Sequence, residues 1–188
     1  ENGLANNTIL EIYQDKTGFL WLGTDVGITR YDGVHFHNYD LPENGLRAVK
    51  RICEVEQDSL LWIKKDGLKE IACFDKKTEL YLPLESTQDG LLTDIADICL
   101  ADSALYGITS AGIVRLNYQR NQNGIRITPE MVMEANRELL RLQCGGKSLY
   151  TLDDQKMEAY INLTVSGNES TVIASGAEVA AYEKDKND

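Results

Sequence analysis

The sequence lacks the features that mark membrane-spanning and nucleic-acid-binding proteins. No apolar run approaches the roughly 20 residues of a membrane helix, so we expect no membrane insertion of this segment. Basic side chains are in deficit, because 19 Lys and Arg stand against 30 Asp and Glu and give a formal net charge of −11 over 188 residues. Phosphate backbones select basic surfaces, and we therefore expect no nucleic-acid partner.

Cysteines and the common catalytic motifs are scarce as well. The four cysteines form no CxxC pair and lie in or beside apolar runs, which predicts buried thiols at Cys53, Cys73, Cys99 and Cys144. No GxSxG, HExxH or phosphate-loop pattern occurs in the chain. We expect no enzymatic activity and no cofactor, although a glycosidase that uses two of the many carboxylates stays open as an alternative.

The two histidines do not form a metal-binding pattern. His35 and His37 lie on one face of an expected strand, but no third ligand has a suitable spacing nearby. We interpret them as an exposed pair and expect no metal site.

What the chain does contain is an internal repeat. Residues 20–32 read LWLGTDVGITRYD and residues 105–117 read LYGITSAGIVRLN, with matching aromatic, glycine, aliphatic and arginine positions. Two less similar copies lie elsewhere in the chain. The aromatic anchors of the four copies lie 41, 44 and 44 residues apart and are Trp21, Trp62, Tyr106 and Tyr150. This period is typical of a four-stranded propeller blade of about 40 to 45 residues.

The residues inside each period favour strands. In the first repeat, residues 9–14, 19–24, 28–31 and 34–39 alternate or are rich in aliphatic and aromatic side chains, and turn residues separate them. We therefore predict an all-β fold of four-stranded antiparallel propeller blades, about four blades plus a remnant. We also expect the four aromatic anchors to pack between adjacent blades rather than to stack on a ligand.

The repeat register defines one partial propeller region over residues 1–188. The blades are expected at residues 3–40, 46–84, 91–128 and 136–175. Residues 129–142 begin with a helix-start signal, but the register assigns 138–143 to the first strand of the fourth blade. We therefore predict a long connection at 129–137. After residue 163 we expect one or two further strands, at 170–175 and 178–182.

The first repeat resembles the two-component regulator propeller repeat. The resemblance rests on GLANN at residues 3–7, DKTGFLWLGT at 15–24 and RYDG at 30–33. Later copies match less closely, and the second has Lys64-Lys65 in place of Gly23-Thr24. The family is found in the periplasmic sensor region of bacterial hybrid two-component regulators. There, propellers of about seven blades precede an immunoglobulin-like domain, a membrane helix, a histidine kinase and a response regulator.

This resemblance implies a periplasmic sensor that binds an oligosaccharide or glycan breakdown product and signals across the membrane, as a homodimer when full length. Seven blades of about 40 residues require roughly 280 residues, so this chain is either part of a larger seven-bladed propeller, which we favour, or a smaller closed ring. The remaining blades or a second copy of the chain would complete the larger propeller. A non-enzymatic scaffold for protein–protein interaction and a glycan-active propeller enzyme are the alternatives.

The repeat also indicates where a ligand would bind. Loops between second and third strands and connections between blades should converge on one propeller face. The polar residues that we predict as ligand-binding are Asp25, Arg47, Lys64, Lys65, Asp66, Asp89 and Asp153. Because the chain opens at Glu1 without a methionine or a signal peptide, we interpret it as a mature or excised segment.

Overall fold

A computed structural model describes seven segments of the chain. They are residues 3–41, 48–55, 58–134, 139–145, 148–153, 158–162 and 169–173. Within them the backbone is almost entirely strand, and the helical element is the short 3₁₀ helix η1 (Leu91–Thr93). Two compact units share the chain, one made of residues 1–94 and 118–128 and the other of residues 95–117 and 129–188. The prediction of an all-β fold is confirmed.

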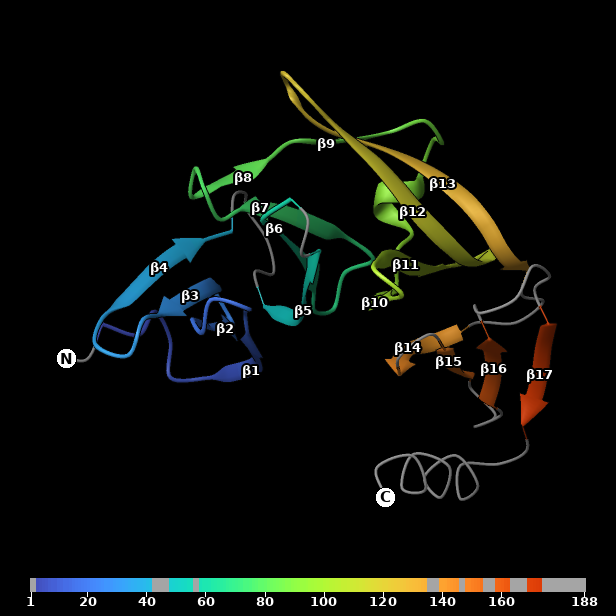
Figure 1. The fold of residues 1–188 in the computed structure, drawn as a ribbon, viewed down its shortest axis with the longest axis horizontal. Coiled ribbons are helices and arrows are strands. Elements are labelled where there is room, and N and C mark those ends of the chain that lie inside the picture. The colour runs from blue at the N-terminus through green and yellow to red at the C-terminus, as the bar shows by residue number, and fades with distance from the viewer. Residues whose placement is uncertain are drawn as a thin grey trace. The chain divides into compact units, whose positions relative to one another are not determined.

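The first unit holds two antiparallel four-stranded sheets, drawn in blue and in teal to green in Figure 1. The first sheet is ordered β1 (Ile9–Gln14), β2 (Leu20–Thr24), β3 (Gly27–Tyr31) and β4 (Phe36–Asp40). The second sheet is ordered β5 (Val49–Val55), β6 (Leu60–Lys65), β7 (Ile71–Asp75) and β8 (Leu80–Leu82). These are the two sheets that the first and second repeats predict.

The third and fourth repeats also form sheets. The third contains β10 (Asp97–Ala101), β11 (Ala104–Thr109), β12 (Gly112–Asn121) and β13 (Gly124–Glu134), with β9 (Leu84–Ser86) parallel to β13. The fourth contains β14 (Leu139–Gly145), β15 (Ser148–Asp153), β16 (Glu158–Asn162) and β17 (Glu169–Ile173). The β12–β13 hairpin contributes its tip, residues 118–128, to the first unit.

The same irregularity recurs in the first strand of three sheets. The register between first and second strands shifts at residues 9–11, 49–51 and 139–141, which is the position of a β-bulge in each case. Ile12, Ile52 and Leu142 then take the same place, opposite Leu22, Ile63 and Thr151. The sequence repeat therefore corresponds to the same pairing register between first and second strands in these three sheets.

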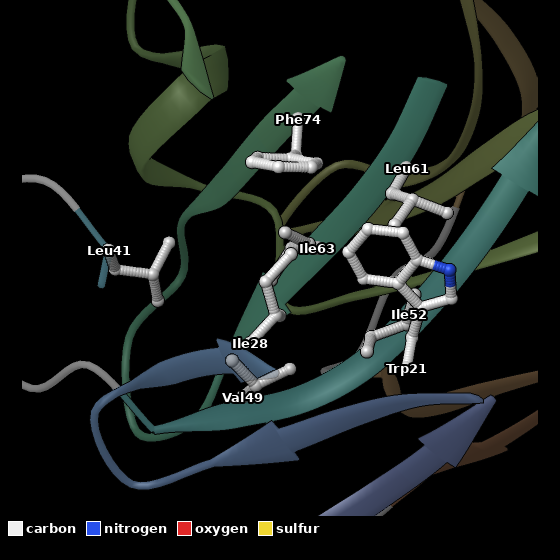
Figure 2. Packing of buried hydrophobic residues seen from close by; sticks show 8 residues of the cluster. All are labelled: Trp21, Ile28, Leu41, Val49, Ile52, Leu61, Ile63 and Phe74. Carbon is white, nitrogen blue, oxygen red and sulfur yellow. The ribbon is translucent and has the colours of Figure 1, made fainter. Parts of the chain in front are cut away.

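The core of the first unit lies between its two sheets. Trp21 and Ile28 of the first sheet pack with Ile52, Ile63 and Phe74 of the second, as Figure 2 shows. The Trp21 and Phe74 rings meet edge to face with their centroids 5.6 Å apart. Burial of such large side chains drives the packing of one sheet on the other.

The second unit repeats this arrangement. Tyr106, Ile108 and Ile113 of the third sheet form a buried cluster with Leu142 and Leu149 of the fourth. The aromatic anchors Trp21 and Tyr106 thus both belong to clusters that join two sheets, and Trp62 and Tyr150 are buried as well. The expectation that the anchors are core residues is confirmed.

The connection predicted at residues 129–137 is wrong for residues 129–134, which continue strand β13 to Glu134. Cross-strand pairing with β12 in the sheet outweighs the local helix-start signal at this place. Pro129 is tolerated because β9 pairs with β13 only at residues 125–127, so the strand has an open edge at the proline. Residues 135–137 lie outside the described residues.

Three of the four cysteines are buried as expected, whereas Cys144 is exposed. Cys144 is the next-to-last residue of strand β14, where the side chain lies beyond the buried cluster that contains Leu142. Its apolar sequence neighbours therefore do not predict its exposure. All four remain thiols rather than disulfides.

The strand expected near residues 170–175 is present as β17, which ends at Ile173. The strand expected at 178–182 and the remnant after residue 175 lie outside the described residues. Among the described residues, no helix is both long and apolar enough to cross a membrane.

Candidate functional site

The Asp-x-x-Gly-x-Leu-Trp motif of the first repeat builds a turn. Oδ1 of Asp15 accepts hydrogen bonds from the backbone N–H groups of Thr17 at 2.9 Å and Phe19 at 3.1 Å. Its Oδ2 accepts a 2.9 Å hydrogen bond from Nε1 of Trp21. One buried carboxylate therefore closes the β1–β2 turn and fixes the central aromatic of the sheet.

Gly23 and Thr24 follow in the same strand as Trp21. Gly23 allows close packing of a neighbouring strand, and Thr24 stabilises a second turn. A Cβ on Gly23 would lie 2.7 Å from Cγ1 of Val49, so only glycine lets strand β5 approach this closely. The hydroxyl of Thr24 donates to the carbonyl of Gly27 at 3.0 Å. Thr109 and Gly112 repeat that bond at 3.1 Å in the third sheet. These motif residues therefore support the packing and the turns of the sheets.

A buried ionic cluster links the first and second sheets. Nζ of Lys76 lies 3.1 Å from Oδ2 of Asp15 and also bonds the carboxylate of Glu54. The Tyr13 hydroxyl donates to Glu54 at 3.3 Å. Burial alone would raise the pKa of Asp15, but hydrogen bonds from Thr17, Trp21 and Lys76 outweigh it and lower the pKa to about 2.

A second ion pair links the same sheets nearer the surface. Nη1 of Arg30 lies 2.7 Å from Oε1 of Glu79, in the turn after β7. The guanidinium also lies over the Phe19 ring, 5.2 Å from its centroid. The repeated arginine therefore joins the two sheets, and its interactions are structural.

A pocket of about 470 Å³ lies where the β6–β7 turn meets the connection that follows β8. Its lining is mostly aliphatic and aromatic with three polar side chains: Lys65, Glu70, Ile71, Ala72, Tyr81, Leu82, Pro83, Leu84, Leu92 and Thr93. A turn between second and third strands and a connection between sheets thus do form one hollow. Its size falls within the range of small-molecule sites.

The polar end of the pocket is an ion pair. Nζ of Lys65 lies 2.9 Å from Oε2 of Glu70, and the backbone N–H of Lys65 donates to the carbonyl of Glu70 at 3.2 Å. The Thr93 hydroxyl donates to the carbonyl of Gly90 at 3.1 Å and keeps its capacity to accept. These groups can bind hydroxyls as both donors and acceptors.

The predicted site residues have different environments. Lys65 lines the pocket, and Asp66 is exposed in the same turn. Asp89 is exposed in the connection that leads to η1, and Asp25 is exposed in the β2–β3 turn of the first sheet. Asp153 ends strand β15, in the other compact unit. Arg47 lies outside the described residues.

Lys64 differs most from its expectation, because its side chain is only 1% exposed. Its ammonium donates to the carbonyls of Lys65 and Leu68. Lys64 takes the register position that Gly23 holds in the first sheet, which is a buried position. In this structure its ammonium supports the β6–β7 turn from within.

Sequence reasoning missed most of the pocket. Glu70 was not identified as the partner of Lys65, although both flank one hairpin turn with opposite charges. Tyr81 and Leu92 come from separate segments that only the fold brings together. No local signal in the sequence identifies those two residues.

The structure places an acidic residue beside the histidine pair. Nδ1 of His35 and Nε2 of His37 lie 3.6 Å and 3.7 Å from Oδ2 of Asp32. Both side chains are well exposed, and the described part of the chain contains no group of three or more such ligands suited to a metal ion. Backbone hydrogen bonds from His35 and Val34 lower the pKa of Asp32 to about 2.

Known proteins share the repeat and the fold. Residues 3–26 match the family described as two component regulator propeller. An extracellular domain assigned to the hybrid two component system BT3049 from B. thetaiotaomicron is 17% identical, with a TM-score of 0.63 over 91% of this chain and 25% of that chain. PorZ, a surface component of the type-IX secretion system of Porphyromonas gingivalis, is 12% identical, with a TM-score of 0.56 over 91% of this chain and 22% of that chain.

At these identities the solved structures establish the fold alone. The chain spans about a quarter of the length of the BT3049 domain. No curated protein sequence matches it. The four-stranded sheets and the shared fold show a chain of β-propeller type, in which residues 3–26 carry the match to the two component regulator propeller family.

Proposed function

We propose that the chain is the propeller portion of the periplasmic sensor region of a two-component system, and that it binds an oligosaccharide or glycan breakdown product. The matched repeat at residues 3–26 and the fold shared with the BT3049 extracellular domain support the sensor role. Transmission of the signal would require a membrane helix and a kinase from a longer protein. In that protein two copies of the propeller would act as a homodimer.

The pocket beside Lys65 carries the ligand part of this proposal. It combines an apolar lining with a few polar groups, which is the usual composition of a small-molecule site. It also lies between the two kinds of loop that the repeat predicts for binding.

The burial and bonding of two carboxylates, among the residues that the structure describes, favour a binding role over catalysis. Asp15 and Glu54 form a carboxylate pair around Lys76, but both carboxylates are buried and bound to its ammonium. A glycosidase requires one carboxylic acid and one carboxylate that reach the substrate. This buried pair is therefore structural.

The proposal includes a further propeller blade on the first sheet. Ile9 and Ile12 of β1 are 41% and 63% exposed, whereas Val49 and Ile52, at the same register positions of β5, are 0% and 3% exposed. The preceding sheet covers Val49 and Ile52. A blade of the same type, from a longer chain or a second copy, would cover the equivalent positions on β1.

Thermal unfolding with and without glycans tests the ligand. A ligand at 100 times its dissociation constant adds about 2.7 kcal/mol to the free energy of unfolding. We expect a saturable rise in the melting temperature with one class of plant or host oligosaccharide and no turnover of that sugar. A melt that no glycan shifts would favour the scaffold alternative, and hydrolysis of the glycan would favour the enzyme.

A further inference from the structure

We infer that the pocket between the β6–β7 turn and the β8–η1 connection selects uncharged sugar units over uronic acid or sulfated units. This inference rests on the proposed oligosaccharide ligand and specifies its chemical class. It follows from three properties of the pocket, which are its apolar floor, its fixed walls and its balanced charge.

The floor suits one face of a sugar ring. Ile71, Leu82 and Leu92 line it together with the ring of Tyr81. A pyranose has an apolar C–H face and a hydroxyl-bearing edge, so it can bury the first against aliphatic and aromatic side chains. The edge then faces the polar end of the pocket.

The walls are held in place by bonds outside the pocket. The Tyr81 hydroxyl donates to the carbonyl of Tyr39 at 3.1 Å, and its ring contacts Phe74 with centroids 5.1 Å apart. The carbonyl of Pro83 accepts a 2.9 Å hydrogen bond from the backbone N–H of Ile125. A preformed pocket loses little conformational freedom on binding, which favours a small ligand.

The ion pair at the polar end determines the charge preference. Lys65 and Glu70 neutralise each other at 2.9 Å. A sugar hydroxyl can accept from the ammonium and donate to the carboxylate, so both groups keep their pairing. A uronate or sulfate group near Lys65 would instead face the negative charge of Glu70, which costs binding free energy in a partly buried site.

The surrounding charges balance in the same way. Nζ of Lys69 lies 4.0 Å from Oδ1 of Asp94, next to the lining residues Glu70 and Thr93. Lys64 directs its ammonium to backbone carbonyls, and Asp66 lies in the same turn. Lys65 and Lys69 are thus each paired with a carboxylate, and the whole chain carries a net charge of −11. No excess of positive charge is present to attract an acidic glycan.

Titration calorimetry on the full chain tests the inference. The probes are neutral gluco-, xylo- and manno-oligosaccharides and, as the acidic class, oligogalacturonate. We expect at least one neutral class to bind about tenfold or more tightly than oligogalacturonate, and Lys65→Met to weaken that binding by about tenfold. Glu70→Gln leaves Lys65 unpaired and should shift the preference about tenfold toward oligogalacturonate.

Controls keep the outcomes separable. Lys77→Met and Glu134→Gln change exposed residues outside the pocket and should bind like the wild type. Thermal melts check that each variant folds, and Lys65→Gln replaces Lys65→Met if the latter does not.

Two results overturn the inference while the sensor proposal stands. One is wild-type binding of a neutral glycan that neither pocket variant changes. The other is oligogalacturonate binding as tightly as the neutral classes. If the wild type binds no glycan of either class, the proposed ligand fails and this inference fails with it.

Discussion

The indole nitrogen of Trp21 donates a 2.9 Å hydrogen bond to Oδ2 of Asp15, the carboxylate that also closes the β1–β2 turn. Lys76, in the turn after β7, lies 3.1 Å from the same oxygen. The most specific motif of the sequence therefore fixes a turn, a core aromatic and the neighbouring sheet through one side chain. This relationship makes the stability of the first unit testable at single residues.

Replacing the buried carboxylate should destabilise the first unit. Asp15→Asn removes the charge that pairs with Lys76 and leaves one acceptor oxygen for two places, so either Trp21 or the turn N–H groups would face an NH2 donor. Leaving a buried charge unpaired costs about 3–5 kcal/mol; because Lys76 keeps Glu54 as a partner, we expect a loss at the lower end, about 3 kcal/mol in the free energy of unfolding. Chemical denaturation measures it, with the exposed Asp25→Asn as control. Equal stabilities of the two variants would contradict the structural role of Asp15.

Acid should weaken the same unit through Asp15. The pKa of this carboxyl is lowered from 3.8 to about 2 in the folded protein, so the folded state binds its proton less readily than the unfolded state. The stabilisation is therefore complete above about pH 4 and is lost as the pH falls toward about 2. Unfolding measured between about pH 6 and pH 2.5 should show a smaller acid dependence in Asp15→Asn than in the wild type. Parallel pH profiles would contradict this assignment.

Adding one methyl group at Gly23 should disturb the contact between the first two sheets. A Cβ there would lie 2.7 Å from Cγ1 of Val49 and 3.1 Å from Cβ of Glu11. We expect Gly23→Ala to cost about 1–3 kcal/mol through overpacking. The double variant Gly23→Ala/Val49→Ala should recover part of the loss relative to the sum of the two single variants. Strict additivity would show that the two sites are not in contact.

The exposed face of β1 should respond differently from the buried face of β5. Ile12→Ser should change the free energy of unfolding of this chain by less than about 0.5 kcal/mol, whereas Ile52→Ser should cost about 3 kcal/mol. In a longer protein that supplies a blade on β1, Ile12→Ser should become as costly as Ile52→Ser. Denaturation of both variants in both proteins checks this. Unchanged tolerance of Ile12→Ser in the longer protein would exclude this docking face.

Much of the fold could be predicted because the sequence repeats. The spacing of Trp21, Trp62, Tyr106 and Tyr150 sets the period, and alternation within the first period defines its strands. The prediction was wrong at residues 129–134, where helix-forming signals are local and the pairing of β13 in its sheet is not. Propensity is overridden where a sheet supplies the hydrogen bonds.

The candidate site was much harder to predict from the sequence. Lys65, which lines the pocket, could be predicted because the repeat shows that it lies where the second strand of its sheet ends and the turn begins. Its neighbour Lys64 is buried because strand β6 lies inside its sheet and is covered on both faces from Leu60 to Lys64. Glu70, Tyr81 and Leu92 come together only through the path of the chain after β8.

Hydrogen exchange in the presence of a neutral oligosaccharide tests whether the pocket beside Lys65 binds the sugar, because it reports both binding and its place in the chain. We expect slower exchange in residues 65–72 and 81–93, which contain the pocket lining, with little change in the turn at residues 15–19. Protection confined to another part of the chain, or none at a concentration that saturates binding, would contradict it.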